Sequence, residues 1–132
     1  MAENSSAEKK FLEEKVDKAL EEAWSKVNIA VESTAKRLEQ STMTLWLAAE
    51  AAEYSSALFS LAYGLEDLDP EVKITKGRDF LELVKDSMEA LKRARELRPK
   101  SVAEAYTSLR TAAGYLKAAY LGQSKKTAKK PS

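Results

Sequence analysis

The chain has 132 residues, enough for one domain with a hydrophobic core, and its content of 44% hydrophobic and 33% charged residues is typical of a globular protein. Cysteine and histidine are absent, which excludes disulfides, thiolate metal sites and histidine-dependent catalysis. The 22 basic and 21 acidic residues nearly cancel, but four lysines fall in residues 123–132, so residues 1–122 carry a net charge of −3, unlike a typical nucleic-acid-binding body.

The first predicted element is a long helix over residues 6–39. Ser5 and Glu8 form a capping-box pattern, in which each side chain can bond the backbone N–H of the other residue. No glycine or proline interrupts the segment, and its apolar residues recur at intervals of three and four, as on one face of a helix. These residues are Leu12, Val16, Ala19, Ala23, Val27, Ala30 and Leu38.

A second helix is predicted over residues 43–65, after the capping candidates Ser41 and Thr42. Its composition is dominated by alanine and serine. Because small side chains let neighbouring backbones approach closely, we expect this helix to be the central and most tightly packed one. Gly64 is placed to form a left-handed cap at its end.

The clearest break in the chain is Asp69-Pro70, since proline cannot continue a helix. Residues 72–77 are interpreted as either a short helical turn or an irregular linker. A third helix is then predicted from Arg78 to Pro99, because the residue before a proline is disfavoured in helical conformation.

The fourth helix is predicted to begin at a second capping box, Ser101 to Glu104, and to stop at Gly122. Residues 123–132 contain no large apolar side chain, so a disordered lysine-rich tail is expected there, as is disorder in residues 1–5. Four helices with short connections favour an all-α, antiparallel up-down-up-down four-helix bundle over residues 6–122.

Two groups of side chains are candidates for function. Basic residues near the end of the third helix either complement the helix dipole or contact phosphates together with the tail. Trp24 and Trp46 are either core side chains or markers of an interface. The basic candidates are Lys92, Arg93, Arg95, Arg98 and Lys100, with Lys125, Lys126, Lys129 and Lys130 in the tail.

No sequence motif indicates an enzyme, a cofactor or a metal site. Glu50 and Glu53 lie three apart, but a di-metal bundle also needs histidines, so these carboxylates are interpreted as a solvated helix face. The chain has neither a nucleophile elbow nor a glycine-rich phosphate loop.

No apolar stretch reaches membrane-spanning length and no signal core opens the chain, so we expect no membrane contact and a cytoplasmic location. The scarcity of Asn and Gln beside abundant Lys, Glu and Arg is a bias of thermophilic, archaeal-like proteins.

The segment from Ala94 to Pro99, followed by Glu104-Ala105-Tyr106 and Leu109, resembles the junction between successive tetratricopeptide repeats. The rest of that repeat differs, since Thr75 and Arg78 stand where glycine and tyrosine occur in the family. The alanine-rich helical pattern is also similar to small archaeal proteins of the HEPN type, whose RNase members carry an arginine–histidine motif that this chain lacks. Neither resemblance implies a functional site in this chain.

These observations favour a non-enzymatic helical module that binds a protein partner or forms a homodimer. The alternative is an accessory factor of nucleic-acid machinery that uses the basic cluster and the tail. A small-molecule sensor with a pocket between helices is a third hypothesis.

Overall fold

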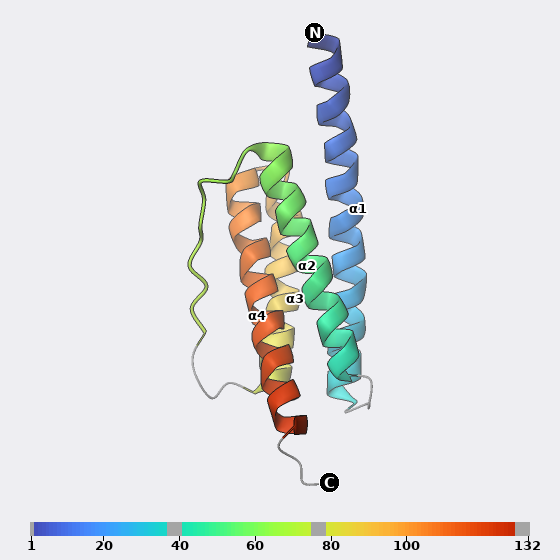
Figure 1. Cartoon of the computed structure of the whole chain (residues 1–132), viewed down its shortest axis with the longest axis vertical. Coiled ribbons are helices and arrows are strands. Elements are labelled where there is room, and N and C mark those ends of the chain that lie inside the picture. The colour runs from blue at the N-terminus through green and yellow to red at the C-terminus, as the bar shows by residue number, and fades with distance from the viewer. Residues whose placement is uncertain (1, 37–40, 75–78, 129–132) are drawn as a thin grey trace.

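The computed structural model describes the backbone of residues 2–36, 41–74 and 79–128 and contains four α-helices (Figure 1). Within those ranges no strand occurs, so the predicted all-α class is confirmed. The helices are α1 (Ala2–Ala35), α2 (Ser41–Tyr63), α3 (Phe80–Leu97) and α4 (Val102–Ala128).

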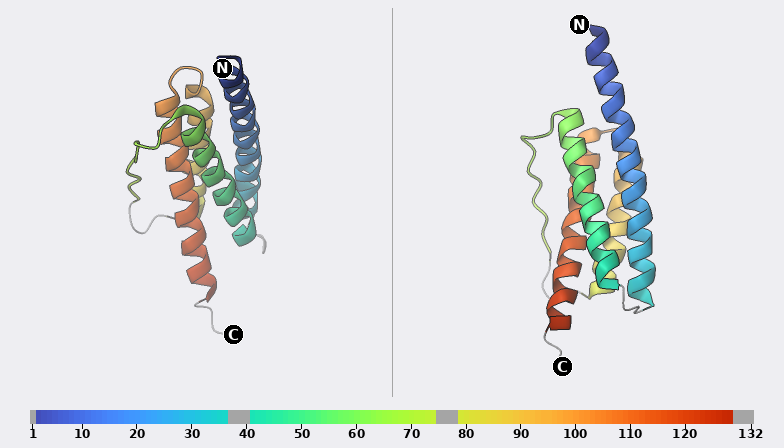
Figure 2. Two further views of the ribbon diagram at one scale, coloured as in Figure 1. Left: turned by 45° about the horizontal axis from the view of Figure 1, so that its top comes forward. Right: turned by 45° about the vertical axis from the view of Figure 1, so that its right-hand side comes forward.

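Each helix packs against two others. α1 contacts α2 and α3, and α4 contacts the same two helices, whereas α1 and α4 lie diagonally across the bundle (Figures 1 and 2). The order around the bundle is therefore α1, α2, α4, α3. α2 has the same number of neighbours as the other helices, so the expectation that it is central is wrong.

The core is formed by the apolar faces that the spacing predicts, and small residues dominate it on α2. Phe59 is the largest fully buried side chain. Other buried members are Val16, Leu20, Ala23, Val27 and Ala30 of α1, Leu45, Ala48 and Ala52 of α2, Val84, Leu91 and Ala94 of α3, and Leu109, Ala112, Leu116 and Ala119 of α4.

The expected up-down-up-down order is wrong at the connection between α2 and α3. Arg98, directly after α3, donates a hydrogen bond to the hydroxyl of Tyr63, the last residue of α2, over 3.1 Å. α2 and α3 therefore end at the same end of the bundle, and Figure 1 shows them running in the same direction. Since the two lie on a diagonal, every pair of helices in contact is still antiparallel.

The length of residues 64–79 explains this arrangement. At about 3.3 Å per residue an extended segment of this size spans roughly 50 Å, whereas a helix as long as α3 measures roughly 27 Å. The connection is thus long enough to return along the bundle before α3 begins, and Figure 1 shows its described part, residues 64–74, running back beside α4. Residues 72–74 are irregular, as one of the two interpretations expected, while residues 75–78 lie outside the described residues.

Two glycines of α4 make room for segments packed against it. A Cβ atom at Gly114 would lie 2.8 Å from Cγ1 of Val72 in the connection. At Gly122 it would lie 2.6 Å from Cε1 of Phe80, the first residue of α3. The prediction that Gly122 stops the helix is wrong, because this glycine serves a close approach inside α4, which continues to Ala128.

The predicted ends of the bundle also shift. The backbone of α1 is helical from Ala2, so Ser5 lies inside the helix and is not its cap. No glycine or proline precedes Ser5 to prevent an earlier start. The backbone of residues 123–128 belongs to α4 instead of a disordered tail, and residues 129–132 lie outside the described residues.

Two helix ends follow the sequence signals closely. Gly64 has φ of +63°, and the Leu65 N–H donates to the Ser60 carbonyl over 3.0 Å, which together form a Schellman cap. At the start of α4 the Glu104 N–H donates to Ser101 Oγ over 3.3 Å. The Ser101 N–H donates to the Leu97 carbonyl over 2.7 Å instead of to the Glu104 side chain, so only half of the capping box forms.

α3 ends at Leu97, before Pro99 as expected, but for a different reason. Arg98 keeps right-handed helical angles (φ −50°, ψ −48°) even though it precedes a proline. The helix ends instead because Pro99 has no N–H to donate to the carbonyl one turn earlier.

Replacing Gly114 with alanine is expected to lower the free energy of unfolding by about 1 kcal/mol. The clash with Val72 outweighs the gain of roughly 1 kcal/mol that alanine brings to a helix. In a Val72→Ala background the same substitution should stabilise the protein, since the obstructing side chain is gone. Urea denaturation of the four proteins measures both effects. If Gly114→Ala stabilised the parent chain, that result would contradict the close contact between Val72 of the connection and Gly114 of α4.

Candidate interaction surface

The predicted basic cluster is divided between two sides of α3. Lys92, Arg95 and Arg98 line a groove between α1 and α3, and Lys92 also lines a second groove, between α3 and α4, together with Arg93. Lys100 is exposed in the turn that follows α3. The structure therefore brings three of the five residues to one face and sends the other two elsewhere.

Arg98 joins three helices at one end of the bundle. Its side chain is 18% exposed, pairs with Asp17 of α1 and also donates to the main-chain carbonyl of Glu13 over 3.3 Å. Its third partner is the hydroxyl of Tyr63 in α2. Burial lowers the pKa of Arg98, and the negative charge of Glu13 opposes that change. Burial raises the pKa of Tyr63, and Glu13 raises it further. The arrangement is a structural clamp between α1, α2 and α3.

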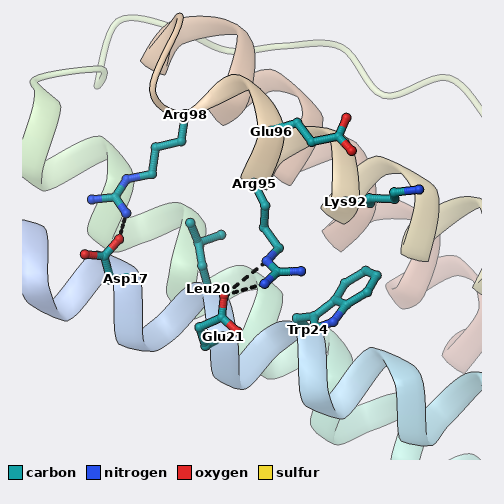
Figure 3. A pocket seen from close by; sticks show the side chains of 8 residues that line it. All are labelled: Asp17, Leu20, Glu21, Trp24, Lys92, Arg95, Glu96 and Arg98. Atoms are coloured by element: carbon teal, nitrogen blue, oxygen red, sulfur yellow. Dashed lines mark hydrogen bonds and ion pairs between the residues drawn. The ribbon is translucent and has the colours of Figure 1, made fainter.

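Arg95 lies on α3, one helical turn before Arg98, and its side chain contacts α1 (Figure 3). Its Nη2 and Nε atoms lie 2.6 and 3.1 Å from Oε1 of Glu21. Its guanidinium carbon lies 4.9 Å from the centre of the Trp24 ring, within range of a cation–π interaction. Trp24 is half-buried and packs against the core, so its placement agrees with the core interpretation.

The groove between α1 and α3 contains balanced charges. It encloses about 540 Å³, and three acidic side chains line it beside three basic ones (Figure 3). Because Arg95 and Arg98 are paired with carboxylates of α1, they do not present a basic surface to a phosphate. Lys125 and Lys126 lie in α4 by their backbone, and Lys129 and Lys130 lie outside the described residues.

The outer face of α2 carries a row of large exposed apolar side chains. Met43, Tyr54 and Leu61 are 58%, 56% and 63% exposed, and Leu47 lies between them on the same face. Trp46, one of the two predicted interface residues, is exposed beside this row. We call the positions 43, 47, 50, 54, 57 and 61 the α2 row.

Sequence reasoning missed this row apart from Trp46, although a signal was present. α2 contains no lysine or arginine, and apolar residues lie opposite its predicted core face as well as on it. A helix that is apolar all around is normally covered on every side. In this bundle α2 has helices on two sides and leaves the row open.

α1 extends the apolar surface beside the row. Phe11 is exposed and shares a groove of about 310 Å³ with Tyr54. Lys15 lies over the Phe11 ring, with Nζ 5.0 Å from the ring centre. Ile29 is also exposed on α1. The apolar side chains of this surface therefore lie among charged ones, since Glu14, Lys15, Lys18 and Glu22 line the same groove as Phe11 and Tyr54.

Comparison of the chain with protein-family models, with curated proteins and with solved structures found no match. Among the helices of the described residues, none combines the length and apolar character needed to cross a membrane. The part of the chain that the structure describes also holds no group of three or more carboxylates arranged to bind a metal ion.

Proposed function

We propose that this protein is a non-enzymatic helical interaction module that docks on a protein partner through the outer face of α2, in the cytoplasm. The α2 row is the observation that supports the proposal. Taking about 200 Å² for a fully exposed large side chain, Met43, Trp46, Leu47, Tyr54 and Leu61 together present about 500 Å². That area is at the upper end of what a monomeric protein leaves open to water.

A site-specific cross-linking experiment tests the proposal. A photoreactive residue at Tyr54 should form a discrete cross-linked product in extracts of the native source, because the position lies at the centre of the α2 row. The matched control is Lys85, which is exposed on α3, the helix diagonal to α2. Leu61→Glu in the same chain should suppress the product, since a buried carboxylate without a partner is costly. Equal products from Tyr54 and Lys85, or one insensitive to Leu61→Glu, would contradict the proposal.

The nucleic-acid alternative has less support. It would depend on Lys92, Arg93, Lys100 and the lysines after Gly122, because Arg95 and Arg98 are paired with α1. Such contacts bind any sequence and weaken steeply with salt. Salt-sensitive binding to a nucleic acid by the unmodified chain, lost when these lysines are replaced with glutamine, would favour this alternative.

A further inference from the structure

We infer that the partner on the outer face of α2 is a second copy of this chain, with the two α2 helices packed antiparallel across a twofold axis level with residue 52. The inference rests on the proposed function and specifies its partner. Both copies would use the same surface, as closed dimers generally do.

The spacing of the α2 row fits this arrangement. Its intervals are four, three, four, three and four residues, which read the same in both directions. The average is that of an α-helix, so the row stays on one face over its whole length. Antiparallel pairing then places position 43 against position 61 of the second copy, 47 against 57, and 50 against 54.

The residues at paired positions complement each other. Met43 meets Leu61 of the second copy, and Leu47 meets the small Ala57, which leaves space for the larger side chain. Glu50 is the one charged residue in the row, and it meets the phenol of Tyr54, whose O–H can donate to the carboxylate. The symmetry repeats each contact, so both carboxylates gain a donor.

The charge of Glu50 also excludes the parallel arrangement. In a parallel twofold pair each residue faces its own copy, and Glu50 would meet the same carboxylate across the seam. Like charges at such a position are destabilising. The antiparallel pair replaces that repulsion by a hydrogen bond.

The size of the surface agrees with a dimer. A stable interface buries roughly 800 Å² on each partner. The α2 row and Trp46 supply much of that area, and Phe11 of α1, which shares a groove with Tyr54, extends it. Since α2 has no basic residue, the row offers an acidic partner surface no complementary charge, whereas a second copy supplies the Tyr54 O–H to Glu50.

The first test uses charge at position 54 of the full chain. Tyr54→Lys places an ammonium against Glu50 of the second copy and should keep the dimer, whereas Tyr54→Glu places two carboxylates together and should raise the dissociation constant about tenfold or more. Sedimentation over a concentration series measures both variants. Position 54 is exposed in the monomer, so both should fold, which circular dichroism checks. Equal weakening by the two substitutions would overturn the antiparallel pairing.

The second test uses cysteine cross-linking, which is clean because the chain has no cysteine. Leu47→Cys protein mixed with Ala57→Cys protein should give a disulfide-linked heterodimer under mild oxidation. Either variant alone should not, since two copies of position 47 would lie about 15 Å apart along the helix axis. Cross-linking of Leu47→Cys with itself and not with Ala57→Cys would overturn the register.

A protein that stays monomeric at all concentrations would overturn the inference without removing the proposed function. In that case the Tyr54 photoproduct would contain a different protein and would still be lost with Leu61→Glu. Loss of both the dimer and the Tyr54 photoproduct would remove the proposed function as well.

Discussion

Replacing Arg98 with alanine is expected to lower the free energy of unfolding by about 2–3 kcal/mol, the upper part of the range for hydrogen bonds to a charged group. The substitution removes contacts to Asp17, to the Glu13 carbonyl and to the Tyr63 hydroxyl at once. The effect stays below that of a fully buried ion pair because Asp17 is 61% exposed and water can replace the lost partner. Urea denaturation at pH 7 and low protein concentration measures the loss.

Arg95→Ala is the matched control for Arg98→Ala. Arg95 lies in the last turn of α3 and Arg98 directly follows this helix, and each pairs with a carboxylate of α1. The Arg95 side chain, however, is 34% exposed and its partner Glu21 is 63% exposed. An exposed pair with one cation–π contact should contribute about 1 kcal/mol or less. Equal losses in the two variants would show that the burial of Arg98 and its bond to Tyr63 do not matter. A double-mutant cycle with Tyr63→Phe would isolate that bond.

Phe59→Ala should have a larger effect than Arg98→Ala, a loss of about 3–5 kcal/mol in the free energy of unfolding. Phe59 is fully buried, and its ring centre lies 5.3 Å from that of Tyr63. The neighbouring inward positions on α2 hold alanine and serine, which cannot extend to fill the cavity. Thermal and urea denaturation measure the loss.

Phe59→Leu and Tyr54→Ala are controls for the Phe59 prediction. Leucine keeps most of the volume, so its loss should stay under about 1.5 kcal/mol. Tyr54 is another aromatic residue of α2, but it is exposed in the monomer, so its removal should change monomer stability by under about 0.5 kcal/mol. A loss of under 1 kcal/mol for Phe59→Ala would contradict the close packing of α2 around this ring.

The sequence predicts the existence and type of the helices well because each helix repeats its apolar face over many turns. It also predicts a helix end where a single residue forms the cap, as with the left-handed Gly64 at the end of α2 and the hydrogen bond to Ser101 at the start of α4. The prediction at Gly122 is wrong because a glycine that ends a helix and a glycine that allows a neighbouring side chain to approach look the same in one sequence. The position of Phe80 against it, more than 40 residues away in the chain, decides between them.

The direction of α3 could not be predicted from the sequence, because it is set by contacts between segments far apart in the chain and not by a local residue pattern. Residues 64–79 contain one proline and two glycines, which indicate a break between helices but do not predict the path of the connection. The path is set by contacts such as Val72 with Gly114, which join segments far apart in sequence.

The candidate site was predictable in part. Arg95 and Arg98 are three apart within the predicted third helix, and Asp17 and Glu21 are four apart on α1, so each pair shares a helix face. That spacing favours ion pairs between the two helices over a basic surface open to phosphates. The α2 row was also visible as apolar residues opposite the core face, but its exposure depends on which helices surround α2.

The long connection between α2 and α3 divides the bundle into two helical hairpins, α1 with α2 and α3 with α4, that lie side by side. Within each hairpin only a few residues separate the two helices, and the ion pairs of Arg95 and Arg98 join one hairpin to the other. Covalent continuity between the hairpins raises their effective concentration but does not define their mutual geometry. A chain cut within residues 66–68 is therefore expected to reassemble from its two fragments as a split protein, with a melting temperature that depends on fragment concentration.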